Sequence, residues 1–233
     1  MKKINLLLLV IAFVAFTVSC KKDSKDTPAA KPSKPSISQG GEVVTVPAAL
    51  KSNPDPNAGM CVSYIETANG IGDYFSWFDV PDNAQEVSLK STNELYHTWL
   101  WSYNGSSVWT KWWEDLSKYY WEMDIAFNSG PRYNFMKAEE TKDGKSGKLE
   151  YFDYVTTQQM IVKYTWETSS ADVFTFVADV VSTFKYVVVV NPNNSGSVKL
   201  YLGESLYWEA SWNVDGSGTW NMPGVGSGSW TAK

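Results

Sequence analysis

Apolar and polar residues alternate along most of the chain from residue 95 to residue 230. The clearest run spans residues 117–127, where Tyr119, Trp121 and Met123 alternate with lysine, tyrosine, glutamate and aspartate. A period of two is typical of a strand that has one dry face and one solvated face. Glycine, asparagine or aspartate interrupts the alternation at intervals of about ten residues, and this spacing predicts consecutive antiparallel hairpins.

The same pattern places the turns. Asn104-Gly105 accepts the two positive φ angles of a type I′ turn and therefore predicts a tight hairpin. Glycine-rich turns that lead into a tryptophan, at residues 215–220 and 225–230, predict further hairpins at the end of the sheet. The remaining predicted strands are residues 95–102, 107–113, 117–127, 132–140, 148–153, 160–166, 173–178, 184–190, 197–202 and 206–213.

We therefore expect a mainly β fold, an antiparallel β meander that curls into a half-barrel or barrel. About eleven strands approach the limit of an open twisted sheet, which favours curling. All but one of the 12 tryptophans follow residue 84. Each buried tryptophan removes roughly 150–250 Å² from water, so a handful of them would dominate the core. Residues 186–190 are apolar on both faces, which predicts a strand covered on both sides.

Residues 41–94 carry a helical pattern, and we expect them to form a helical lid segment packed on the meander of residues 95–233. Asp55 offers a capping carboxylate, and Pro56 follows at the first helical position. Apolar residues then recur at helical spacing, and the pattern predicts that the helix falters at Gly70 and the glycine two residues later.

Two shorter stretches flank this helix. Residues 45–52 predict one short helix, and residues 74–78 form a strongly aromatic run that ends before Pro81. Within that run, Trp77 and Phe78 have two possible roles. They could line a ligand site between the helix and the sheet, or they could belong to the core.

The first twenty residues carry the features of a targeting signal. Positive charge in residues 1–3 precedes an apolar run at residues 4–16, which is too short to span a bilayer comfortably. The run is followed by Thr17, Ser19 and Cys20. This segment resembles a bacterial lipoprotein signal peptide: Ser19 and Cys20 match the end of the lipobox, in which a small residue precedes an invariant cysteine, whereas Thr17 stands where leucine is usual.

The resemblance implies cleavage before Cys20, which makes residues 1–19 the signal peptide. It also implies acylation of Cys20 with diacylglycerol and an N-acyl chain. Several acyl chains hold a protein firmly on a membrane, whereas one chain gives only marginal binding. The alternative is an ordinary secretory signal that ends in cysteine.

Residues 20–40 are expected to form a disordered tether, because lysine, aspartate, proline, alanine and serine cannot bury a core. Lys21 stands where aspartate would favour the inner membrane, which is similar to lipoproteins sorted to the outer membrane. The charged residues that follow resemble surface-export tags of Bacteroidota lipoproteins. In outline the chain resembles the small, lipid-anchored, β-rich lipoproteins of that group. We therefore expect an outer-membrane location, on the periplasmic or the cell-surface face.

The net charge and the residue composition limit the partners and the catalytic groups that we expect. The formal net charge is −5, and removal of Lys2 and Lys3 with the signal peptide leaves 18 basic against 25 acidic side chains. No concentrated basic face is evident, which argues against nucleic acid as a partner. His97 is the only histidine, and Cys61 fits a small buried hydrophobe, so we expect no metal site, no cofactor and no histidine-based catalysis.

The expected function is non-enzymatic: an envelope-structural role or the binding of an apolar small molecule between helix and sheet, by a monomer. The alternative is glycan capture by the rings of a cluster of exposed aromatic side chains. A glycosidase that uses carboxylate pairs, such as Glu114-Asp115 or Glu139-Glu140, is a further alternative. The cluster that would capture a glycan is Trp113, Tyr119, Tyr120 and Trp121.

Overall fold

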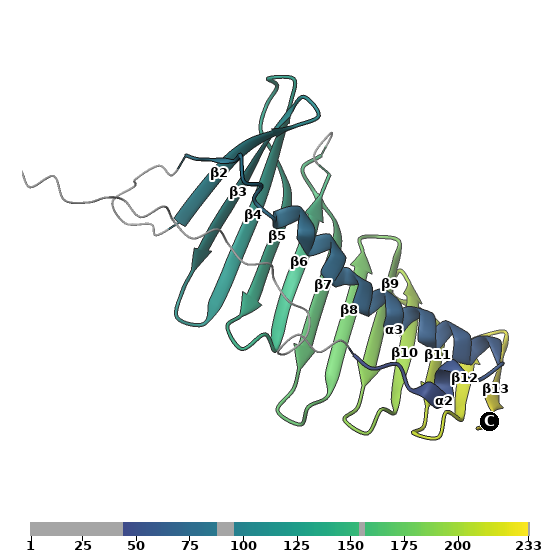
Figure 1. The fold of residues 1–233 in the computed structure, drawn as a ribbon. Helices are drawn as coiled ribbons and strands as arrows, with labels where there is room; N and C mark the ends of the chain where they lie inside the picture. Colours follow the sequence, from purple (N-terminus) through teal and green to yellow (C-terminus); the bar gives the residue numbers. More distant parts are fainter. Residues whose placement is uncertain (1–43, 88–95, 154–156, 233) are drawn as a thin grey trace, which may run out of the picture. The chain divides into compact units, whose positions relative to one another are not determined.

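The computed structural model describes residues 44–87, 96–153 and 157–232. Within them, thirteen antiparallel strands form one sheet, in which neighbouring strands follow one another in the chain (Figure 1). The predicted mainly β fold and its meander topology are confirmed. β1 and β13 lie at the two edges and do not pair with each other, so the sheet is open and does not close into a barrel.

The proposed signal peptide of residues 1–19, the tether of residues 20–40 and the lipidation site Cys20 lie outside the described residues. The described part of the 41–94 segment contains three helical elements and the short strand β1. All other strands follow residue 95, as the alternation predicts.

The strands follow the alternating runs, and β1 is the one that the pattern did not predict. It is two residues long and pairs with Trp99 and Leu100 of β2. Asn104 and Gly105, between β2 and β3, have φ angles of 48° and 80°, as the predicted hairpin turn requires. The strands are β1 (Gln85–Glu86), β2 (Tyr96–Tyr103), β3 (Ser106–Glu114), β4 (Lys118–Phe127), β5 (Tyr133–Thr141), β6 (Ser146–Phe152), β7 (Met160–Thr168), β8 (Phe174–Val180), β9 (Phe184–Val190), β10 (Gly196–Leu202), β11 (Ser205–Trp212), β12 (Gly218–Met222) and β13 (Gly226–Trp230).

The helical elements are α2 (Ala48–Lys51), α3 (Pro56–Tyr74) and the 3₁₀ turn η2 (Phe75–Phe78). Asp55 caps α3 as predicted, because its Oδ1 accepts a hydrogen bond from the backbone N–H of Asn57 over 2.8 Å.

The predicted faltering of this helix at Gly70 is wrong, because α3 continues to Tyr74. A helical glycine costs up to about 1 kcal/mol relative to alanine. Full burial of one large apolar side chain stabilises by about 1.5–3 kcal/mol, and Ile71 and Phe75 are both buried here. Packing on the sheet therefore outweighs the low helix propensity of glycine.

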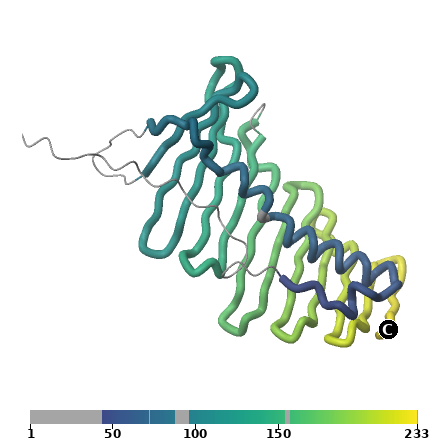
Figure 2. Tube along the Cα trace, in the orientation of Figure 1, coloured from purple at the N-terminus to yellow at the C-terminus, as the bar shows by residue number. Residues whose placement is uncertain are grey.

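Successive turns of α3 lie over successive strands, as the ribbon and the tube both show (Figure 1, Figure 2). One helical turn rises about 5.4 Å, and neighbouring strands are about 4.8 Å apart. A helix that crosses the strands at a steep angle can therefore present one new side chain to each new strand. The contacts run from Asn57 with Trp208 of β11, through Tyr64 with Tyr186 of β9, to Tyr74 with Tyr164 of β7.

The core lies between α3 and the sheet face beneath it, which we call the helix face. The buried helix residues recur every three or four positions, which brings one to the sheet in each turn. Burial raises the pKa of the Cys61 thiol to about 12, so this side chain is a neutral thiol and packs as a small hydrophobe. The buried residues of the helical elements are Leu50, Ala58, Cys61, Ile65, Ala68, Ile71, Phe75 and Phe78.

The opposite face of the sheet, which we call the open face, is polar. One row of directly opposed residues crosses seven strands, from β3 to β9, with strictly alternating charge. Opposite charges on neighbouring strands stabilise a sheet, and like charges would destabilise it. The row is Lys111, Glu122, Lys137, Glu150, Lys163, Asp179 and Lys185.

The prediction that residues 186–190 are covered on both sides is wrong. Tyr186, Val188 and Val190 are buried on the helix face, whereas Val187 and Val189 are only half-buried on the open face. β-branched valines pack well against cross-strand neighbours on a pleated surface, and this suits them to a strand whose second face is partly solvated.

Glycines inside strands stand directly opposite tryptophans at several positions. A Cβ on Gly196 would lie against the backbone oxygen of Val189 and the indole of Trp212. In these pairs the indole lies over the glycine of the neighbouring strand. This packing explains the repeats of glycine and tryptophan, which the sequence pattern assigned to turns. The opposed pairs are Gly147 with Trp166, Gly196 with Trp212, Trp212 with Gly218, Gly218 with Trp230, and Trp220 with Gly228.

We predict that Gly196→Ala lowers the free energy of unfolding by about 1–3 kcal/mol, because the added methyl group overpacks a site bounded by backbone and a rigid ring. Gly70→Ala is the matched control, since nothing lies within 4 Å of its Cβ position. This control is expected to stabilise the protein by about 0.5–1 kcal/mol. Denaturant unfolding of both variants checks the pair, and equal effects would contradict the Gly and Trp packing.

Candidate functional site

An apolar cleft lies where the helical layer ends. η2 ends at Phe78, and its Trp77 packs against Phe135 of β5, while the sheet continues to β2, so the helix face of β2–β5 is only partly covered. The cleft has a volume of about 490 Å³. Its apolar lining consists of Trp77, Pro81, Trp101, Tyr103, Val108, Met123, Ile125 and Phe135, and Ser76, Asp79, Asn83 and Ser102 contribute polar groups.

Local backbone geometry positions the two rings at the mouth of the cleft. In η2, Phe75 and Phe78 are buried, whereas Trp77 is 53% exposed. A β-bulge interrupts the pairing of β4 with β5, because the register shifts after Met123. The extra residue is Phe135, and its ring centroid lies 5.8 Å from that of Trp77 at an interplanar angle of 60°. The bulge thus directs an aromatic side chain toward the helical layer.

The chemistry of the cleft suits reversible binding of an apolar molecule. Its lining is largely aromatic and aliphatic, with few polar groups at the rim, as in small-molecule sites generally. Tyr103 is 62% exposed and Trp77 is 53% exposed, and both rings line this cleft. Among the described residues, no group of three or more His, Cys, Asp or Glu side chains could hold a metal ion.

The two helical aromatic candidates have different environments. Trp77 lines the cleft, whereas Phe78 belongs to the core and is 1% exposed. Five other lining residues lie in strands that the alternation predicts, and no pattern marks them as a site: Trp101, Val108, Met123, Ile125 and Phe135. The alternation marks Ile125 as a dry-face residue, yet no signal in the sequence shows that the helical layer ends before it.

The four aromatic candidates for glycan capture do not form one platform. β4 alternates, so Tyr119 and Trp121 point to the helix face, where Trp121 is 1% exposed. Trp113 and Tyr120 lie on the open face and stack on each other at 5.1 Å. The ammonium group of Lys111 is 4.9 Å from the centroid of Trp113, so neighbouring side chains already pack on this ring.

Tyr120 also takes part in the turn between β3 and β4. Its hydroxyl donates a hydrogen bond to Oδ2 of Asp115 over 2.8 Å. Oδ1 of Asp115 accepts bonds from the backbone N–H groups of Ser117 and Lys118. The hydrogen bond to Asp115 raises the pKa of Tyr120 to about 12, so the phenol is neutral and holds the turn.

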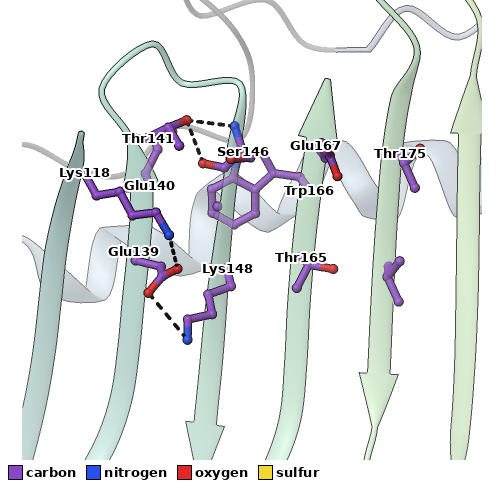
Figure 3. A pocket seen from close by; sticks show the side chains of 12 residues that line it. Lys118, Glu139, Glu140, Thr141, Ser146, Lys148, Thr165, Trp166, Glu167 and Thr175 are labelled. Atoms are coloured by element: carbon purple, nitrogen blue, oxygen red, sulfur yellow. Dashed lines mark hydrogen bonds and ion pairs between the residues drawn. The ribbon is translucent and has the colours of Figure 1, made fainter. Parts of the chain in front are cut away.

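A second depression, of about 300 Å³, lies on the open face of β4–β8 (Figure 3). Three of its charged groups are paired with one another: Lys118 donates to Glu139 over 2.8 Å, and Lys148 lies 3.5 Å from the same carboxylate. Burial opposes ionisation of Glu139, but the hydrogen bonds and charges of the two lysines outweigh it and lower its pKa. The helix lies behind the sheet in this view, so the depression opens on the face away from the helix.

The carboxylates considered for a glycosidase either have bonding partners or point to different faces of the sheet. Glu114 lies 3.0 Å from Lys142, and Asp115 accepts a hydrogen bond from the hydroxyl of Tyr120 over 2.8 Å. Glu140 lies on the helix face and is buried, whereas its neighbour Glu139 is on the open face. The side chains of Glu139 and Glu140 therefore point to opposite sides of the sheet.

No helix in the described ranges has both the length and the apolar character that a membrane crossing needs.

We predict that Glu139→Gln lowers the free energy of unfolding by about 1 kcal/mol at pH 7. Because the folded-state pKa of Glu139 is lowered, its stabilising contribution is present above the ordinary glutamate value of 4.5 and is lost as the pH falls. The difference from the parent chain should therefore shrink below pH 4.5 in urea unfolding. Glu204→Gln, at an exposed turn, is the control and should change stability little at either pH.

Comparison of the chain with protein-family models, with curated proteins and with solved structures finds no match in any of the three. Its function is therefore inferred from the residues and the geometry described above.

Proposed function

We propose that this protein is a lipid-anchored binding protein of the outer membrane, and that it holds an apolar small molecule in the cleft between η2 and β2–β5. The cleft is the observation that carries this proposal. Its volume of about 490 Å³ falls within the range of small-molecule sites, about 300–1,000 Å³.

Binding at this cleft would cover apolar surface that the fold leaves in water. Trp77 and Tyr103 are more than half exposed, and burial of aromatic surface in such a site is favourable by about 25 cal/mol per Å². Asp79 and Asn83 at the rim supply polar groups that could orient a ligand with one polar end. An apolar molecule with a small polar head fits this distribution.

The anchor is supported by the sequence Thr17-Val18-Ser19-Cys20, which resembles a lipobox. A triacylated cysteine would keep the sheet and its cleft next to a membrane, where apolar molecules are concentrated. Anchor and cleft are therefore consistent with one role, which is to bind or pass on an apolar compound at the envelope.

We predict that the uncharged apolar dye Nile red binds the cleft. Trp77→Ala should weaken its affinity by about tenfold or more, since a large aromatic contact is worth at least about 1.4 kcal/mol. Ile125→Trp should also weaken binding, because the larger side chain fills the cleft. Fluorescence titration measures both effects, in a chain carrying Cys20→Ser so that no detergent competes for the dye.

Tyr207→Ala provides the matched control for this titration. Tyr207 is an aromatic residue of β11 that is 44% exposed and does not line the cleft. Its replacement should leave the affinity unchanged. An affinity that Tyr207→Ala lowers as much as Trp77→Ala does would refute the cleft as the binding site.

For the anchor, we predict that Cys20→Ser releases the protein from the membrane fraction, because the acylated thioether can no longer form. Cell fractionation followed by mass spectrometry of the mature N-terminus measures the change. Cys61→Ser is the control, since this buried thiol is unrelated to the anchor and should leave the membrane retention intact. Retention that persists without Cys20 would contradict the proposal.

A further inference from the structure

The strand β13 forms an open edge of the sheet. In the described part of the chain it pairs with β12 alone. Every second residue of such a strand directs its N–H and C=O groups away from the sheet, and this row is a template for another strand. Natural proteins usually protect an edge with charged residues, proline or a bulge. Residues 226–230, with the sequence Gly-Ser-Gly-Ser-Trp, contain none of these.

The other edge of the sheet is protected. β1 consists of only two residues and carries Glu86, whose Oε1 lies 3.2 Å from Nδ1 of His97 in β2. A short edge strand with a charged side chain is a common device against unwanted pairing. Within the described residues the two edges therefore differ, since β13 is an uncharged strand of five residues and β1 is a charged strand of two.

A register for a strand on β13 can be taken from the neighbouring strands β10–β13, where glycine stands opposite Trp212, Trp220 and Trp230. Trp212 has glycine on both sides, Gly196 in β10 and Gly218 in β12. Trp230 has Gly218 on its inner side, while the position on its outer side belongs to no described strand. A strand that continues the sheet in the same way would place a glycine opposite Trp230.

We propose that β13 pairs antiparallel with β13 of a second copy of this chain, centred on Gly228. In this register Gly228 faces its own counterpart, and Trp230 faces Gly226 of the second copy. Because the strand has the sequence Gly-x-Gly-x-Trp, Trp230 of each copy then has a glycine on both neighbouring strands, as Trp212 has. The interface is isologous, so it closes as a dimer and leaves no further β13 edge for growth.

The neighbouring positions also fit this register. Ser227 lies opposite Ser229 of the second copy, and both are small, uncharged and exposed on the open face. Past the end of the strand, the backbone oxygen of Thr231 already accepts a hydrogen bond from Nδ2 of Asn53 over 2.8 Å. The loop between α2 and α3 therefore limits the paired segment to residues 226–230, the five residues that the proposed register uses.

Sedimentation velocity of the full chain in a density-matched detergent tests the proposal, and the parent chain is expected to show a reversible dimer. The variant Ser227→Lys with Ser229→Lys places like charges opposite each other across the interface and should weaken the dimer at least tenfold. The matched control carries Thr219→Lys and Asn221→Lys. These residues lie directly opposite the two serines on β12, which is paired on both sides, so this control should still dimerise.

A charge-swap experiment separates β13 pairing from other modes of association. A second variant carries Ser227→Glu and Ser229→Glu, and neither charged variant should dimerise alone. Their mixture should form a heterodimer, because each lysine then faces a glutamate. Circular dichroism and thermal unfolding of each variant verify that the sheet is folded.

Four results would overturn the proposal. The parent chain could be monomeric throughout the concentration range, or the dimer could survive lysines at both serines. A mixture of the two charged variants that stays monomeric would also exclude this register. Open-ended polymers of the parent chain would show a head-to-tail contact and would count equally against the closed dimer.

Discussion

The structure depends on a match between two repeats, the rise of a helical turn and the spacing of β-strands. Since α3 crosses the strands, each turn places a side chain over a new strand, from Asn57 at β11 to Tyr74 at β7. A meander alone would expose one apolar face along its whole length. The helix covers most of that face, which explains why the sheet remains open without losing its core.

The open face meets the opposite requirement, since it must remain in water without attracting other sheets. Its alternating row of lysine and acidic side chains is neutral over short distances, and Lys148 joins Glu139 to Glu150 between adjacent rows. Such pairs contribute little stability individually. Their arrangement nevertheless fixes strand register, because a slip of one residue would move charged side chains into the core.

The alternation of residues was sufficient to predict the meander and most strand bounds, since side chains must point alternately in and out. Local periodicity does not encode tertiary packing. Three features depend on that packing: the open edge of the sheet, the continuation of α3 past Gly70, and the exposed side of residues 186–190. For the cleft, Trp77 was a candidate, but Phe135 reaches it through a bulge. The proposed platform of Trp113, Tyr119, Tyr120 and Trp121 is split by the same alternation that predicted the strands.

The helical layer has one mechanical consequence. Strands beneath α3 are tied to a common element, so separating any two of them disturbs packing along the helix. β2–β4 lie beyond η2 and are held mainly by their own ladder and by β5. Local opening is easiest where few buried contacts must break, so this end should loosen first, on a shorter timescale than global unfolding. A guest molecule could thus enter beside Trp77 while the remainder of the sheet stays assembled.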